Sequence, residues 1–246
     1  MDLLKATPEA ISDYFGFLIE FTTSPARALE PHLATTTIAD AKVSSKLLVY
    51  CGFGVGMSVL LVTLVNSLGY PMAMNPFYAS LPGMDQATLP LAMAIAIFVV
   101  AVGMHIIGKL INVIFLAIAN AANTSLERLG VKKTPSWLAL RHMANALYET
   151  DRWRSLQGAT ATVNAFFAYS AWFIPANTIL FVVLSLFQEH DKAVFIIVTT
   201  LFTLVTLFAR LQPTFAATHE IPQFEAFVVL FLSLSIAFSI VASGML

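Results

Sequence analysis

The residues of this chain that could take part in chemistry are few, and their spacing matches no common catalytic pattern. The five histidines lie far apart in the sequence, at His32, His105, His142, His190 and His219. None of them has a second ligand at the short spacings typical of metal sites. His219-Glu220 begins like the zinc motif HExxH, but Pro222 breaks the helix that this motif needs, and its second histidine is missing. The zinc-hydrolase interpretation therefore fails.

Carboxylates and phosphate-binding loops are also missing from the places where an active site would need them. No Asp or Glu lies deep in a long apolar tract, which argues against an intramembrane aspartyl protease and against a carrier built on a buried carboxylate. The sequence has no Walker loop, no GxSxG and no GxGxxG. We therefore expect a protein that is not an enzyme and that binds no cofactor or metal.

The most polar of the apolar tracts, residues 159–187, supplies a different kind of candidate site. It lies in a stretch without charge between Arg154 and Glu189, long enough to cross a bilayer. Polar side chains and a proline in hydrocarbon need partners on neighbouring helices, so we expect this helix to be the inner one. Its polar residues either bond neighbouring helices, which is the commoner arrangement, or line a permeation path. The candidates are Thr160, Asn164, Tyr169, Pro175 and Asn177.

Composition places these candidates in a helical membrane protein. The chain is 58% apolar and 11% charged, whereas globular domains are roughly 45–50% apolar and about 25% charged. The charges cluster between long uncharged tracts, a pattern typical of membrane helices rather than of a barrel. The net charge of −1 gives no reason to expect nucleic acid as a partner. Cys51 is the only cysteine, which excludes a disulfide within the chain.

The apolar tracts predict an all-α polytopic membrane protein with five transmembrane helices and amphipathic interfacial helices. The expected organisation is an amino-terminal segment at 1–46, a membrane domain at 47–246 with spans at 47–68, 89–108, 159–187, 193–209 and 226–246, and a basic loop at 109–157. The apolar pattern continues beyond Lys109 without a breaker. We interpret it as one long helix, because a second span there would place the basic loop outside.

Positive charge sets the expected orientation. An amino terminus inside the cell leaves Lys192 as the one basic residue outside. The amino terminus is then cytoplasmic and the carboxyl terminus outside. The basic residues on the inner side are Lys5, Arg27, Lys42, Lys46, Lys109, Arg210 and the six of the long loop.

Two amphipathic helices are expected outside the spans. Thr7-Pro8-Glu9 predicts the start of the first, which should pack under the bundle with an apolar face of Ile11, Phe15, Leu18 and Ile19. Its acidic polar face weakens the case that it lies on anionic lipid. The second begins at Thr134-Pro135 and either lies at the cytoplasmic interface or only connects two spans. The expected interfacial anchors are Lys109, Trp137, Arg141 and Trp153.

Two glycines in the first span, Gly52 and Gly56, stand at GxxxG spacing. This spacing lets another helix approach closely, either inside the protein or in a dimer. We favour packing inside the protein.

Three segments of the chain carry a family resemblance. They are Phe21 to Leu29, with its Ser-Pro and basic residue, His105 to Lys109, and the glycine-led stretch with Gly158, Thr160, Asn164, Tyr169 and Pro175. These segments resemble, in this order, the Ser-Pro and basic segment, the end of the second span and the third span of the Yip (Ypt/Rab-interacting protein) family of multipass membrane proteins, in its bacterial form. Two features depart from the pattern: residues 110–157 are inserted, and the tyrosine-glycine-proline segment of the eukaryotic members is absent.

The resemblance implies a protein without catalytic residues that takes part in membrane organisation, in a bacterial inner membrane, through lipids or partner membrane proteins or by self-association. The missing eukaryotic segment means that Rab-type partner binding is not implied. The alternative is a small permease or a membrane subunit of a transporter complex, with Asn164, Tyr169 and Asn177 lining a path beside Pro175.

Overall fold

The computed structural model describes residues 3–34, 43–68, 89–128, 156–186, 192–219 and 221–244. Within these ranges every element is a helix and no strand occurs, which confirms the all-α class for this part of the chain. In chain order the elements are α1 (Leu3–Thr23), α2 (Pro25–Ala34), α3 (Ser45–Ser67), α5 (Leu89–Arg128), α8 (Leu156–Leu186), α9 (Lys192–Thr206), the π-helix η2 (Leu207–Leu211), α10 (Gln212–His219) and α11 (Gln223–Gly244).

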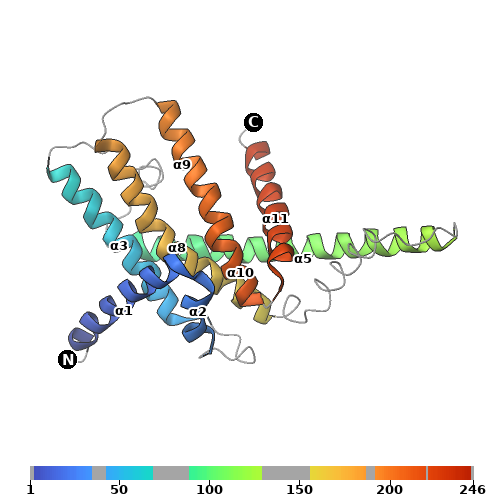
Figure 1. Cartoon of the computed structure of the whole chain (residues 1–246), viewed down its shortest axis with the longest axis horizontal. Coiled ribbons are helices and arrows are strands. Elements are labelled where there is room, and N and C mark those ends of the chain that lie inside the picture. The colour runs from blue at the N-terminus through green and yellow to red at the C-terminus, as the bar shows by residue number, and fades with distance from the viewer. Residues whose placement is uncertain are drawn as a thin grey trace.

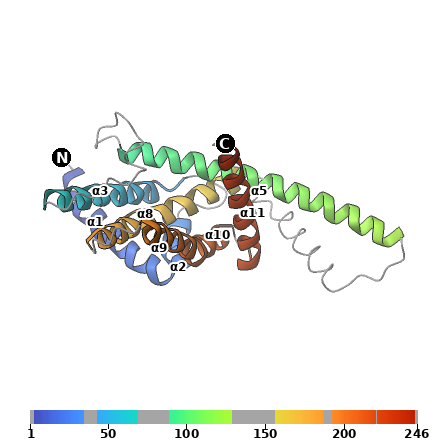
Figure 2. The ribbon, with the colours of Figure 1, turned by 90° about the horizontal axis from the view of Figure 1, so that it is seen from above.

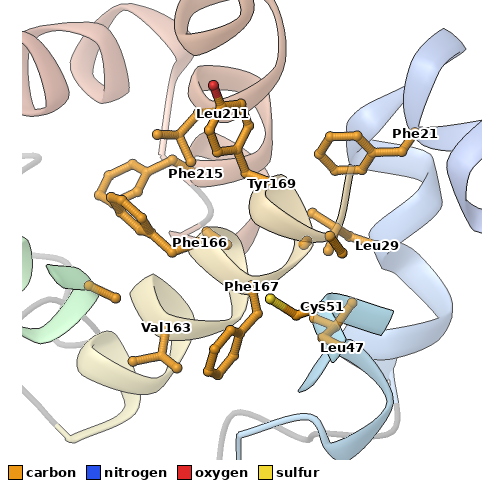
Figure 3. Packing of buried hydrophobic residues seen from close by; sticks show 14 of the residues in the cluster. Phe21, Leu29, Leu47, Cys51, Val163, Phe166, Phe167, Tyr169, Leu211 and Phe215 are labelled. Carbon is orange, nitrogen blue, oxygen red and sulfur yellow. The ribbon is translucent and has the colours of Figure 1, made fainter. Parts of the chain in front are cut away.

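Helix α8 forms the centre of the bundle, as expected of the most polar span. It contacts α1, α3, α5, α9 and α10, and every residue from 162 to 171 is buried. Its aromatic side chains point in different directions. Phe166 points towards Phe215 of α10, whereas Phe167 points to another side of α8 (Figure 3). The inner position predicted for this helix is confirmed.

The helices around α8 differ in direction. In Figure 1, α8 lies between α3 and α9; α3, α8 and α11 run upward and α9 runs downward. The amino terminus lies towards the end of the bundle where α3 begins, and the carboxyl terminus lies towards the other end. Helix α5 crosses the bundle, and its second half extends beyond the other helices in both views (Figures 1 and 2).

Three helical stretches of the described chain are long and apolar enough to cross a membrane: Ser45–Ser67, Gly158–Leu184 and Ile197–His219. The stretches Ala94–Leu110 and Ala226–Ile236 are also apolar but shorter. The structure thus agrees with an integral membrane protein, whereas the count of five spans stays a prediction.

The second expected span does not end near Lys109. Helix α5 runs for 40 residues to Arg128, about 60 Å at 1.5 Å per residue. The expectation of one long helix is confirmed, and this helix takes up the first 20 residues of the segment at 109–157 that was expected to form the basic loop. The physical reason is the absence of glycine and proline from Lys109 to Arg128, so nothing ends the helix.

The fourth expected span, at 193–209, also continues further than predicted. The chain stays helical to His219, through η2 and α10, and Pro213 lies inside this helical stretch. Pro213 cannot donate to the carbonyl of Ala209, four residues earlier. The helix widens there, with the Gln212 N–H bonded to Leu207 O, and Arg210 Nη1 lies 3.4 Å from Ala209 O.

The amino-terminal helices correct two expectations. Helix α1 begins at Leu3 rather than at Thr7-Pro8-Glu9, and Pro8 lies inside it. Helix α1 does pack on the bundle, but by a different face, because Ile11, Phe15 and Ile19 are exposed. The buried side chains are Tyr14, Phe17 and Phe21, which contact the rings of Tyr50, Phe53 and Trp172. Helix α2 starts at Pro25, where proline suits the first position of a helix because it has no N–H to donate.

The remaining boundaries differ little from the prediction. Helix α3 starts at Ser45, because the Ser44 side chain caps it by accepting from the Leu47 N–H. Helices α8 and α11 each begin three residues before the predicted spans at 159–187 and 226–246. The second amphipathic helix and the anchors Trp137, Arg141 and Trp153 lie outside the described residues.

Candidate functional site

A buried polar centre joins three helices on one side of α8. Thr162 Oγ1 lies 3.2 Å from Nδ1 of His105 in α5 and 2.9 Å from Nε2 of His219 in α10. All three side chains are almost inaccessible, with exposed fractions of 3% for His105, 0% for Thr162 and 1% for His219. The two histidines that lie 114 residues apart in the sequence, each 57 residues from Thr162, therefore converge on one hydroxyl.

Hydrogen-bond chemistry assigns a role to each atom of this centre. The Thr162 hydroxyl is also 3.0 Å from the carbonyl oxygen of Gly158. When the hydroxyl donates its single proton to that carbonyl, its two lone pairs are left to accept from both rings. The network then places a proton on Nδ1 of His105 and on Nε2 of His219. Thr162 thus fixes the tautomers and orientations of two imidazoles.

The surroundings of the polar centre are mainly apolar. The ring of Phe215 lies 4.3 Å from that of His219, between centroids. Lys109, four residues after His105 on α5, is half-buried, and the helix continues past it. Histidine is the side chain that exchanges protons most readily near neutral pH. A chain of imidazole, hydroxyl and imidazole inside an apolar bundle is therefore a candidate site for handling protons.

The opposite side of α8 contains a backbone defect and its repair. Pro175 has no N–H, so the carbonyl of Ala171, four residues earlier, loses its helical partner. Tyr14 of α1 fills this position, because its hydroxyl donates to Ala171 O at 2.9 Å in a buried site. The expectation that the proline would need a partner from elsewhere is confirmed, although the partner comes from the amino-terminal helix rather than from another span.

Gly54 makes this repair possible. A Cβ added at Gly54 would lie 2.9 Å from Ala171 O, 3.0 Å from the Tyr14 hydroxyl and 3.3 Å from Pro175 Cδ. Among the described residues, nothing lies within 4 Å of a Cβ added at Gly52 or Gly56. The close approach expected at those two glycines therefore occurs at Gly54, between them.

Among the other predicted polar residues, Asn164 and Tyr169 join α8 to neighbouring elements. Asn164 is buried and its Oδ1 accepts from the Ser44 N–H at 2.9 Å, which ties the start of α3 to α8. Tyr169 Oη lies 3.0 Å from Thr206 Oγ1, which ties α8 to α9. Thr160 is buried and Asn177 is half-buried, both on α8. Two of the five candidates therefore bond neighbouring elements across the bundle.

Trp172 of α8 makes further contacts with neighbouring helices. Trp172 Nε1 donates to Thr22 Oγ1 of α1 at 2.8 Å. The guanidinium of Arg210 lies 5.9 Å from the centroid of the Trp172 ring, within the range of a cation–π contact. Within the part of the chain that is described, no group of three or more His, Cys, Asp or Glu side chains is arranged to hold a metal ion.

Comparison with known proteins adds no assignment: no family model, characterised protein or solved structure matches this chain. The resemblance to the Yip family therefore rests on the residues quoted above.

The sequence did not point to the polar centre or to Tyr14. His105 and His219 showed no short spacing, and only their buried positions reveal a shared partner. Tyr14 belongs to a helix whose other apolar face looked the better candidate for packing. One signal was available for the defect, since Pro175 in mid-span requires a donor for Ala171 O.

Proposed function

We propose that this chain is a five-span membrane protein without catalytic activity, which organises membrane components through its contacts with lipids or with partner membrane proteins. The observation that carries the proposal is the use of polar side chains in α8. Asn164 and Tyr169, which a permeation path would need, bond to Ser44 and Thr206 on other elements. Such bonds hold a bundle together rather than line a route through it.

The direction of the helices supports the proposed topology. Helices α3 and α8 run in the same direction, so the chain between them has to return across the membrane, whereas α5 lies across the other helices (Figure 1). The proposal that α5 makes this crossing rests on its uncharged tract at 89–108. Helices α9 and α11 then alternate in direction. Together with the distribution of basic residues, this favours a cytoplasmic amino terminus and an outer carboxyl terminus. A bacterial inner membrane and a Yip-like role follow from the resemblance alone.

Purification in native lipid particles, followed by mass spectrometry, tests this function. We expect a stoichiometric membrane protein, a self-associated form or a defined set of retained lipids. Recovery as a monomer with bulk lipid only would contradict the proposal.

Single cysteines at Asn164 and Asn177, in a background where Cys51 is changed to Ser, test whether these positions line a permeation path. Both should resist a water-soluble thiol reagent, and labelling of both would contradict the proposal.

A proton-linked permease, or a membrane subunit of one, is the second candidate, and the polar centre of His105, Thr162 and His219 favours it. Ionisable residues inside membrane helices commonly mark proton relays. Proteoliposomes with a trapped pH dye test this candidate under an imposed pH gradient. Proton entry that is lost in His219→Gln and kept in a Thr63→Val control would support it. Thr63 is exposed and bonds within its own helix. Proton entry equal to that of empty vesicles would exclude it.

A further inference from the structure

Helix α1 has three different sectors around its axis. At 3.6 residues per turn, each residue turns the helix by about 100°. One sector is buried against α3 and α8, and contains Tyr14, Phe17 and Phe21. A second sector is exposed and apolar: Ile11, Phe15 and Ile19 follow one another at intervals of four residues, with exposed fractions of 41%, 48% and 70%.

The third sector of α1 is polar. Glu9, Asp13 and Glu20 project on the side away from Ile11, since they lie about 160–200° from it around the helix. The rest of the protein thus covers the first sector, and the third carries carboxylates. The second sector, with Ile11, Phe15 and Ile19, is apolar, and no described side chain covers it. A soluble helix would expose carboxylates here, so the apolar sector calls for an apolar neighbour.

The depth of α1 is given by its contacts with the first turns of α3. Asp13 Oδ2 lies 3.4 Å from Lys46 Nζ, and Lys46 is the last charged residue before the uncharged tract at 47–68. The ring of Tyr14 lies 5.7 Å from that of Tyr50 and 5.8 Å from that of Phe53, between centroids. Helix α1 therefore lies where α3 passes from its charged end into its apolar part.

We propose that Ile11, Phe15 and Ile19 form a lipid-docking surface that inserts among the acyl chains at the end of the bundle where α3 begins. This inference rests on the proposed function, because it takes α3 as a span. Leu48 and Val49 of α3 are exposed at the same end, with fractions of 40% and 47%, and belong to the lipid-facing surface of that span. The exposed sector of α1 extends this surface beyond the spans.

The charges of α1 define the kind of lipid surface. Basic interfacial helices are attracted to anionic headgroups, but the polar sector of α1 carries Glu9, Asp13 and Glu20. Asp13 is paired with Lys46, and anionic lipid would repel Glu9 and Glu20, so the docking is apolar and needs no anionic lipid. Tyr14, on the adjacent buried sector, bonds to Ala171 O. The position of α1 in the leaflet is thereby coupled to the proline defect of α8.

Spin labels on single cysteines in phosphatidylcholine proteoliposomes test the proposal, again with Cys51 changed to Ser. Oxygen reports contact with acyl chains, and a water-soluble nickel chelate reports contact with water. Labels at Phe15→Cys and Ile19→Cys should collide more with oxygen than with nickel. Glu9→Cys is the water-facing control and should show the reverse. Ala28→Cys, at a position 2% exposed, is the buried control and should be protected from both.

The other outcomes separate the possible failures. Nickel exceeding oxygen at Phe15→Cys and Ile19→Cys would overturn the proposal, since the sector would face water. Protection from both reagents would also overturn it, because a second copy or a protein partner would cover the sector. Leu60→Cys, on an α3 position 72% exposed, tests the span itself. Oxygen contact at this control shows that the proposed span stands even when α1 fails.

The lipid dependence provides a second measurement on the same labels. Replacing part of the phosphatidylcholine by phosphatidylglycerol should leave the oxygen contact of Ile19→Cys unchanged or lower it. Oxygen contact that appears only with phosphatidylglycerol would overturn the apolar basis of the docking.

Discussion

The two sides of α8 differ in what their buried hydrogen bonds satisfy. On the side of α8 that faces α1 and α3, Pro175 has no N–H, so the carbonyl of Ala171 lacks its donor within the helix. The hydroxyl of Tyr14 donates to this carbonyl instead, and there is room for this bond because residue 54 is a glycine. Towards α5 and α10, Thr162 bonds two histidines at once. The Tyr14 bond satisfies a backbone carbonyl of α8. The bonds of Thr162 instead bring two ionisable side chains together, and no backbone group requires them.

This difference indicates where function should be sought. A carbonyl left by proline must be satisfied in an apolar bundle, so Tyr14 has a structural reason to be there. Burying the polar rings of His105 and His219 lowers the stability of the fold, and two apolar side chains of similar size would pack here without that cost. The polar centre is therefore the place to test the second candidate function, proton-linked transport, and the Tyr14 contact is the place to test stability.

The largest effect is expected at Gly54. Gly54→Ala places a Cβ 2.9 Å from the backbone oxygen of Ala171, and overpacking of this kind costs about 1–3 kcal/mol. Gly56→Ala, at the open position, should be neutral or stabilise by up to about 1 kcal/mol. Reversible unfolding in mixed detergent measures both. Equal stability of the two variants would show that α3 and α8 do not approach closely at Gly54.

Thr162→Val tests the other side of α8. Valine keeps the shape but removes the hydroxyl, and leaves polar ring nitrogens of His105 and His219 without this partner. We expect a loss of about 1–2 kcal/mol, against no measurable loss for Thr63→Val on the exposed face of α3. A Thr162→Val protein as stable as the Thr63→Val control would mean that the polar centre is not closed as described.

Tyr14→Phe should cost about 0.5–1.5 kcal/mol, because Ala171 O loses its donor. A double-mutant cycle with Pro175→Ala makes the test specific. Alanine at 175 restores an N–H that can bond to Ala171 O within α8, so the cost of Tyr14→Phe should fall in that background. An unchanged cost would show that the hydroxyl contributes through some contact other than the proline defect.

The smallest effect concerns pH. Burial raises the pKa of Tyr14 above its ordinary value of about 10, and the nearby Cys51 raises it further. The phenol is therefore neutral in the folded protein, and its contribution is full below pH about 10 and is lost as pH rises towards the raised value. The stability difference between wild type and Tyr14→Phe should shrink above pH about 10. Thr162→Val is the control, since neutral imidazoles do not titrate in this range.

Part of this arrangement follows from local sequence patterns. Uncharged tracts place α3 and α8, because apolar side chains without charge favour the bilayer and a helix satisfies its own backbone. The polar residues of α8 predict its inner position for the same reason. Absence of glycine and proline from Lys109 to Arg128 predicts that α5 continues beyond the expected span at 89–108.

Other features could not be predicted from the sequence, because they depend on residues that are distant in the chain. The expected fourth span ended at 209, yet the π-helix at Leu207–Leu211 accommodates Pro213 and the chain stays helical to His219. The GxxxG spacing of Gly52 and Gly56 suggested close packing, but the rotation of α3 brings Gly54 against α8. A spacing shows which residues share a face, and only the neighbouring helix decides which face is covered.

The sequence by itself determined the class of this protein. Its composition and its long uncharged tracts favour a membrane environment, and in the absence of water a helix satisfies the backbone N–H and C=O groups of such a tract. It also determined that Pro175 would leave a carbonyl in need of a donor. Tertiary structure alone decided that Tyr14 is this donor, that α1 keeps an apolar sector exposed, and that His105 and His219 meet at Thr162. These contacts join residues 57 to 157 positions apart, and only helix packing brings such distant residues together.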